Sequence, residues 1–162
     1  MTQEIAGSMM IALMVVGLGL ALWGWRRRGA RYRGEAEALI RDIPASVALV
    51  DIDALYVATT EALDPLQRIA ADPLSYRAKA RLALHPEGLL VRIPGEDPVL
   101  FPAEGLEAGR ATWTIDRVVE TDGLVMVRWR LAGRDVDSYF RIVDASATAL
   151  IDALGRVGRG TK

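Results

Sequence analysis

The segment 124–131, LVMVRWRL, alternates between apolar and charged side chains in the carboxyl-terminal half of this 162-residue chain. Val125, Val127 and Trp129 fall on one face of an extended strand, whereas the two arginines fall on the other, because successive side chains of a strand point to opposite sides. Such alternation is typical of an antiparallel sheet that packs on a core on one side and meets water on the other. The segment therefore predicts a half-buried strand within a β-domain.

Further strands are predicted on both sides of this segment, each bounded by residues that are typical of turns. The expected strands cover 55–60, 81–84, 89–93, 99–101, 112–119 and 138–142. Gly88 allows the tight reversal of a hairpin between the second and third of them. The segment 61–75 contains two prolines, so we expect one short helical turn there between strands.

A helical pattern follows the last strand. Asp144 or Ser146 can cap a helix over 147–154, and Gly155 can end it. A small barrel leaves an open end, which an amphipathic helix can close. We therefore expect a mainly β domain with α over residues 45–155: an antiparallel barrel or sandwich of about seven strands closed by a C-terminal helix. Residues 156–162 are expected to form a flexible tail.

The segment 5–25 has no charged residue and the length of one membrane crossing. As a helix it would span about 31 Å, close to the hydrocarbon thickness of about 30 Å. A cleaved secretory signal would need basic residues before a shorter apolar run, but Glu4 precedes this one. A buried core helix would show a polar face, and this segment has none. We therefore expect a retained transmembrane helix.

Aromatic and basic residues at the end of the apolar run predict its orientation. Tryptophan rings favour the membrane interface, and positive side chains favour the cytoplasmic side. We therefore expect residues 1–4 outside and the C-terminal domain in the cytoplasm, at the inner (plasma) membrane. The segment 26–44 is expected to be a basic juxtamembrane segment with a short helix over 35–42. The residues that set interface and topology are Trp23, Trp25, Arg26, Arg27, Arg28, Arg31 and Arg33.

Small residues recur on one side of the predicted membrane helix. Gly17, Ala21 and Gly24 are spaced so that a second helix could approach closely and form a weak homodimer. Small residues are also common in membrane helices for other reasons, so both interpretations stay open.

The formal net charge of −1 conceals two opposite parts. Residues 1–33 hold five Arg and one Glu, whereas residues 34–162 hold 15 Lys and Arg against 20 Asp and Glu. An acidic domain lacks the basic footprint of a nucleic-acid-binding protein. It is also repelled from an anionic bilayer, which favours a protein partner over lipid.

Several classes of site are disfavoured by the residues present. The absence of cysteine excludes disulfide scaffolds and cysteine-ligated metals, and His85, the single histidine, lies at a predicted turn where a structural role is expected. Asp51-x-Asp53 and Asp135-x-Asp137 lack the further oxygen ligands of a Ca²⁺ or Mg²⁺ site. No phosphate-binding glycine motif occurs. We therefore expect no enzyme activity, catalytic residue, cofactor or metal.

One basic patch is a candidate for holding an anionic ligand. Arg77, Lys79 and Arg81 alternate at the entry to a predicted strand, so their side chains project from one face. Lipid headgroups are one ligand for them. A basic stripe on an edge strand also deters aggregation, and this interpretation stays open.

The ordered set of segments resembles a known family. It consists of YVATT at 56–60, the 81–93 hairpin with HPEGL, VLFP at 99–102, GLVMVRW at 123–129 and YFR at 139–141. Together with the apolar helix, it resembles the small actinobacterial single-pass membrane proteins that carry a pleckstrin-homology-like (PH-like) domain. The chain departs from that family at 62–66, where ALDPL replaces an aromatic-containing stretch and makes a ligand role for this loop doubtful.

The expected function is that of a membrane-anchored adaptor or scaffold that docks a protein partner at the cytoplasmic face. The grooves and edge strands of a small β-domain suit contacts with peptides and proteins. Two alternatives remain. One is an anionic-lipid-sensing module that uses the basic patch. The other is an accessory subunit of a transporter or export complex, which only the labels of the resembling family imply.

Overall fold

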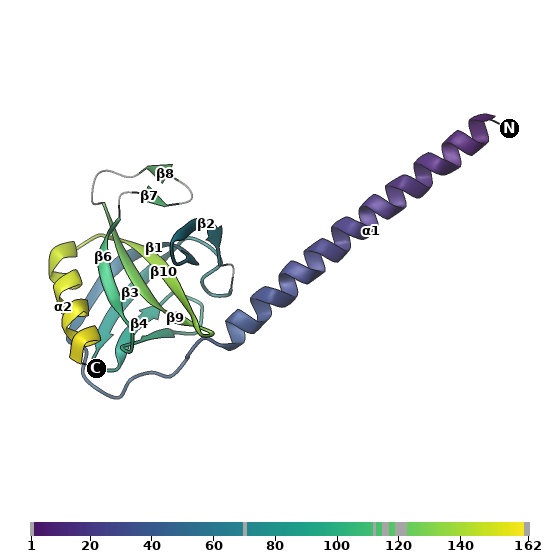
Figure 1. Cartoon of the computed structure of the whole chain (residues 1–162). Coiled ribbons are helices and arrows are strands. Elements are labelled where there is room, and N and C mark those ends of the chain that lie inside the picture. The colour runs from purple at the N-terminus through teal and green to yellow at the C-terminus, as the bar shows by residue number, and fades with distance from the viewer. Residues whose placement is uncertain (1, 70, 112, 115–116, 119–122, 161–162) are drawn as a thin grey trace. The chain divides into compact units, whose positions relative to one another are not determined.

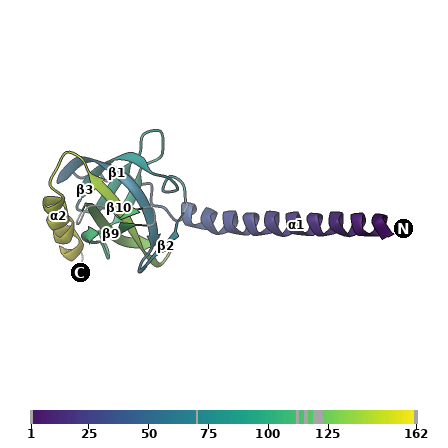
Figure 2. The same ribbon diagram turned by 90° about the horizontal axis from the view of Figure 1, so that it is seen from above.

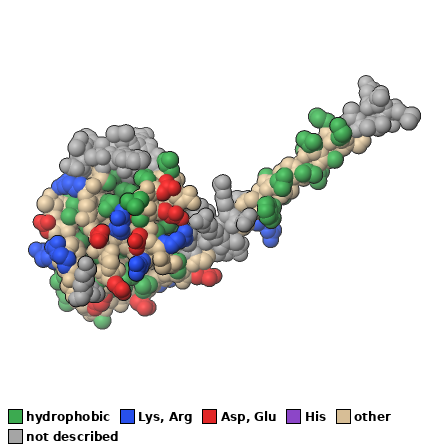
Figure 3. Space-filling view, in the orientation of Figure 1, with side chains coloured by type: hydrophobic (Ala, Val, Ile, Leu, Met, Phe, Trp, Pro, Cys, Tyr) green, Lys and Arg blue, Asp and Glu red, His purple; other side chains and the backbone are tan. Residues whose placement is uncertain are grey.

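The computed structural model of the chain describes residues 2–160 apart from 70, 112, 115–116 and 119–122 (Figure 1). It divides into two compact units, residues 1–34 and residues 35–162. Helix α1, Thr2–Glu37, contains the 18-residue segment Gly7–Gly24, whose mean hydropathy is 1.9 and which has no buried residue. In the described part of the chain, this is the one helix long and apolar enough to cross a membrane. Hydrophobic side chains cover much of its visible surface (Figure 3).

The separate short helix expected over 35–42 is not formed. Helix α1 continues to Glu37, and Ile40 already makes a β-bridge to Leu100. The Leu100 N–H donates to the Ile40 carbonyl at 2.8 Å. The backbone after α1 thus finds its partners on the sheet, which ends the helix well before Pro44.

The second unit is built on an antiparallel sheet. In the described residues it has eight strands, ordered β5-β4-β3-β1-β10-β9-β6, with β2 paired to β1. Two further strands, β7 and β8, form a small separate hairpin. The strands are β1 Val50–Glu61, β2 Asp64–Arg68, β3 Ala78–His85, β4 Gly88–Arg92, β5 Val99–Pro102, β6 Glu107–Ala111, β7 Trp113–Thr114, β8 Arg117–Val118, β9 Leu124–Leu131 and β10 Arg134–Ile142.

Strand β9 begins and ends where its alternation predicted, and its side chains point to the predicted sides of the sheet. Val125, Val127 and Trp129 are buried in the main core, whereas Arg130 is exposed. The Trp129 ring stacks on Phe101 of β5 with centroids 4.0 Å apart. Its indole N–H donates to Ser138 Oγ of β10 at 2.9 Å, which satisfies the one polar group of this buried side chain.

Helix α2, Ala147–Gly160, packs beside β6 and closes one end of the sheet (Figure 2). The expected fold class, a mainly β domain closed by a C-terminal helix, is therefore confirmed. Ser146 caps α2, since its Oγ accepts the Ala149 N–H at 3.4 Å. Gly155 does not end the helix, and residues 156–160 are helical rather than a flexible tail. Gly158 permits this continuation, because a Cβ there would lie 2.0 Å from the Leu106 carbonyl oxygen.

Two segments differ from their sequence-based expectation. Strand β2 pairs back on β1 where a helical turn was expected over 61–75; a strand outside the main sheet path tolerates Pro65. Strand β6 precedes the long strand expected over 112–119, of which residues 112, 115–116 and 119 lie outside the described residues. Edge strands such as β6 are held mainly by ladder hydrogen bonds, so their sequences carry little apolar alternation.

Candidate functional site

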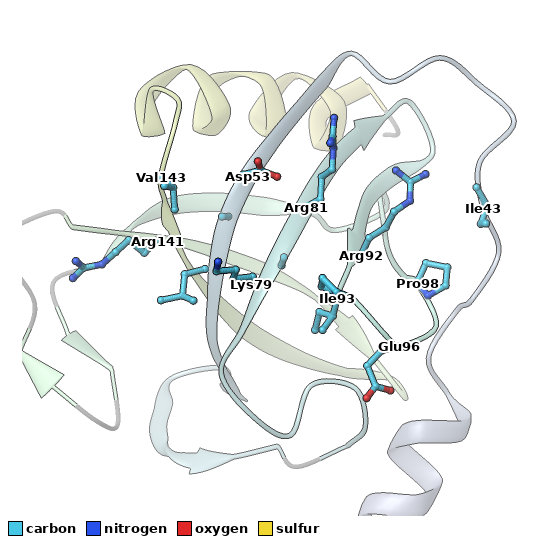
Figure 4. Close-up of a pocket in the computed structure, with 14 residues that line it drawn as sticks. Ile43, Asp53, Lys79, Arg81, Arg92, Ile93, Glu96, Pro98, Arg141 and Val143 are labelled. Carbon is cyan, nitrogen blue, oxygen red and sulfur yellow. The ribbon is translucent and has the colours of Figure 1, made fainter.

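A groove with a cavity volume of about 840 Å³ lies on the outer face of the sheet (Figure 4). It is formed by β1, β3, β4, the end of β10, the turn over 93–98 and one residue of the strap, which we define as residues 40–49. Apolar groups and four cations dominate its surface. The lining residues are Ile43, Asp53, Ala54, Leu55, Lys79, Ala80, Arg81, Arg92, Ile93, Pro94, Glu96, Pro98, Arg141 and Val143.

The strand register brings these side chains together from distant parts of the chain. Leu55 of β1 lies between Arg141 of β10 and Lys79 of β3. One row further along the strands, Arg81 of β3 lies between Asp53 of β1 and Arg92 of β4. Figure 4 shows Arg141 and Arg92 towards opposite ends of the groove, with Lys79 and Arg81 between them.

Arg81 is the one cation of the groove with an ion-pair partner among the described residues. Its Nε and Nη2 atoms donate to the two carboxylate oxygens of Asp51 at 2.7 and 3.0 Å. This hydrogen bond holds the pKa of Asp51 below its ordinary value, and the charge of Arg92 lowers it further. Arg81 is thus largely committed to a partner within the domain.

The other three cations have no such partner. Lys79, Arg92 and Arg141 form no ion pair with any residue that the structure describes. Arg92 also stands directly opposite Arg81, and like charges in that position are destabilising. Three unpaired cations around an apolar floor can bind an anionic group that also brings apolar surface.

The predicted basic patch is only partly on the groove. Lys79 and Arg81 line it, whereas the exposed Arg77 precedes β3 and is not among the lining residues. Arg92 and Arg141 were missed by sequence reasoning. Each alternates with apolar neighbours in its predicted strand, which is a signal for an outward side chain but not for a shared site.

The predicted interface and dimerisation residues lie on α1. Trp23 is 62% exposed, Arg26 is exposed, and a Cβ at Gly17 or Gly24 would meet no neighbouring atom of the described residues within 4 Å. Ala21 is exposed as well. The remaining predicted residues have side chains outside the described part of the structure: Trp25, Arg27, Arg28, Arg31 and Arg33.

The buried His85 attaches the strap to the sheet. Its Nδ1 lies 3.0 Å from the Ser46 carbonyl oxygen and 3.3 Å from Ser46 Oγ, and that hydroxyl donates to Glu87 at 2.5 Å. This hydrogen bond lowers the pKa of Glu87. A further backbone bond, from the Leu49 N–H to the Leu84 carbonyl, holds the end of the strap beside β3. His85 is thus a buried residue that holds the strap against β3 through Ser46.

Three of the four carboxylates in the two Asp-x-Asp sequences lie against arginines. Asp51 binds Arg81, and in the second pair Asp137 binds Arg128 while Asp135 lies 3.5 Å from Arg130. Among the described residues, no group of three or more His, Asp and Glu is arranged to hold a metal ion.

Comparison with known proteins agrees with the geometry of the second unit. A family model described as Bacterial PH domain-like matches residues 39–154, from the strap to α2. No curated protein matches the sequence.

Proposed function

The chain belongs to the Bacterial PH domain-like family, and on that premise we propose that it is a membrane-anchored adaptor whose domain docks a protein partner in the groove. The observation that carries this proposal is the set of three unpaired cations, Lys79, Arg92 and Arg141, around the apolar floor.

The anchor in this proposal is the apolar segment of α1. Gly7–Gly24 has the length and composition of a membrane span, and five arginines follow it within nine residues. Arginines on one flank favour the cytoplasmic side for that flank. We propose that the domain therefore faces the cytoplasm at the plasma membrane, where an enzymatic reporter that works only in the cytoplasm should be active when fused after Lys162.

Charge favours a protein segment over a bilayer as the occupant. Asp53 and Glu96 line the same groove, Asp51 binds its Arg81, and the chain from residue 34 onward carries five more acidic than basic residues. A flat anionic bilayer would approach all these carboxylates at once. A single acidic segment can contact the cations selectively.

The role proposed is binding rather than catalysis. The lining side chains include no hydroxyl, thiol or imidazole group among the described residues. A Ser, Thr or Cys nucleophile activated by a histidine is therefore not among these lining residues, and we propose binding as their role.

Site-specific photo-crosslinking in cells tests the proposal. A photoreactive amino acid at Leu55 of the full-length chain should give a discrete protein adduct that Arg141→Glu or Arg92→Glu removes. A photoreactive residue at Glu104, an exposed position outside the groove lining, is the matched control. An adduct of the same mass from Glu104, or one at Leu55 that survives both charge reversals, would overturn the proposal.

A further inference from the structure

The unpaired cations at the two ends of the groove are separated by a distance that the sheet geometry defines. Arg141 is on β10 and Arg92 on β4, and β1 and β3 lie between these strands. Three steps of about 4.8 Å between neighbouring strands separate the two residues by about 14 Å across the sheet, and an offset of two residues along the strands brings the full separation to about 16 Å.

An extended peptide that crosses the strands obliquely comes within about 2 Å of this spacing, a difference that the long arginine side chains can cover. Its residues advance about 3.4 Å each, so side chains four residues apart point the same way at a separation of about 14 Å. The side chain midway between them also points to the sheet. It would rest on Leu55 and on the aliphatic stem of Lys79, which are paired across β1 and β3 in the floor of the groove.

Resting on the docking function proposed above, we infer that the groove binds an extended partner segment with the pattern acid–x–apolar–x–acid. One carboxylate contacts Arg141, the other contacts Arg92, and the central apolar side chain covers Leu55. Lys79 is placed to add a hydrogen bond to the segment's backbone carbonyls or to either carboxylate.

The charges on the rim make this binding selective. Asp51 occupies Arg81, so the middle of the groove attracts a third carboxylate less than its ends do. Asp53 and Glu96 repel an anion placed between or beyond the two cationic ends. A dense polyanion or an anionic membrane surface meets these carboxylates, whereas the spaced pattern avoids them.

The test compares two labelled peptides of identical composition. The purified full-length chain, in neutral phosphatidylcholine nanodiscs, is titrated by fluorescence anisotropy with a peptide centred on Glu-Ala-Leu-Ala-Glu and with one centred on Ala-Glu-Glu-Leu-Ala. The first should bind at least about tenfold more tightly, a difference of about 1.4 kcal/mol. Raising the salt from about 50 to about 500 mM should weaken it, because the contacts are between exposed charges.

Variants connect the binding to the two ends of the groove. Arg141→Gln and Arg92→Gln should each weaken binding of the spaced peptide by about tenfold and reduce its preference over the clustered peptide. Arg156→Gln removes an exposed arginine of α2 that is not among the lining residues, and should leave both peptides unchanged.

Three outcomes would overturn the inference. The peptides could bind equally, or the two groove variants could behave like Arg156→Gln. A short-chain phosphatidylglycerol could instead bind in a manner that depends on Arg92 while neither peptide does. The photo-crosslink from Leu55 in cells reports separately on the proposed function, so an adduct that depends on Arg92 would leave that function standing when the peptide pattern fails.

Discussion

The outer face of the sheet carries two sets of charged side chains, one with matched partners and one without. On β9 and β10, Arg128 lies directly opposite Asp137 and binds it through two hydrogen bonds of 2.7 and 2.9 Å. On β3 and β4, by contrast, Arg81 lies directly opposite Arg92. Figure 3 shows how closely acidic and basic side chains otherwise mingle on the domain surface in view. Arg81 binds Asp51, so Arg92 is the member of this pair without an ion-pair partner among the described residues, and with Lys79 and Arg141 it forms the unmatched set.

The matched set is partly buried, which makes its pairing important for folding. The Asp137 side chain is only 5% exposed, and the Arg128 side chain is 26% exposed. The hydrogen bond that Arg128 donates to Asp137 raises the pKa of Arg128 above its ordinary value, and the guanidinium stays charged. Each partner depends on the other to offset the cost of leaving water.

Removing the buried partner should have the largest effect. Asp137→Ala should lower the free energy of unfolding by about 2 kcal/mol, because it deletes two charge-assisted hydrogen bonds and leaves Arg128 unpaired. Urea unfolding of the full-length chain in neutral detergent, followed by tryptophan fluorescence, measures this. Asp135→Ala, whose pair is mostly exposed, should cost less than about 0.5 kcal/mol. Equal losses of unfolding free energy in the two variants would contradict the greater importance of the buried pair.

Changing the unmatched set should separate stability from binding. Arg92→Glu replaces a like-charge pair by an opposite-charge pair with Arg81, so the thermal midpoint of the full-length chain should stay the same or rise by about 1–2 °C. Binding of the spaced acidic peptide should be lost in the same protein. Differential scanning fluorimetry and anisotropy on one preparation give both values. A clear fall in the thermal midpoint would show that Arg92 is needed for folding. It would contradict the distinction between the matched and unmatched sets.

The smallest effect concerns the ion pair that Arg81 of the groove forms with Asp51. Arg81 should hold the pKa of Asp51 below the ordinary 3.8, which NMR titration of the Asp51 carboxyl carbon can measure. Since the folded-state pKa is the lower one, the stability from this pair is present above about pH 3.8 and is lost as the pH falls through the folded-state value. Arg81→Gln should return the pKa towards 3.8. If the pKa of Asp51 stays unchanged in that variant, groups other than Arg81 cause the shift.

The parts of the fold that follow local patterns could be predicted from the sequence. Strand β9 and the β3–β4 hairpin have the predicted positions, because side-chain alternation and turn residues act within a few residues of one another. Strands β2 and β6 were not foreseen. Their pairing depends on β1 and β9 already being in place, and their short sequences show no decisive alternation.

The candidate site also has a part that the sequence predicts and a part that it does not. Lys79 and Arg81 were predicted to share a face, since they are two residues apart on one strand. Arg92 and Arg141 join them only through the pairing of β3 with β4 and of β10 with β1. A shift of one residue in either ladder would turn these side chains to the opposite face of the sheet. The pattern within one strand therefore cannot predict which arginines share the groove.

By itself, the sequence determined an apolar segment long enough for a membrane, an acidic β-domain behind it, and which face of each strong strand is apolar. These properties depend on composition and on the geometry of short stretches of chain. Only the tertiary structure decided that Arg141, Lys79 and Arg92 line one groove and that Arg81 faces Arg92. That arrangement results from register between strands distant in the chain, which the packing of the whole core selects.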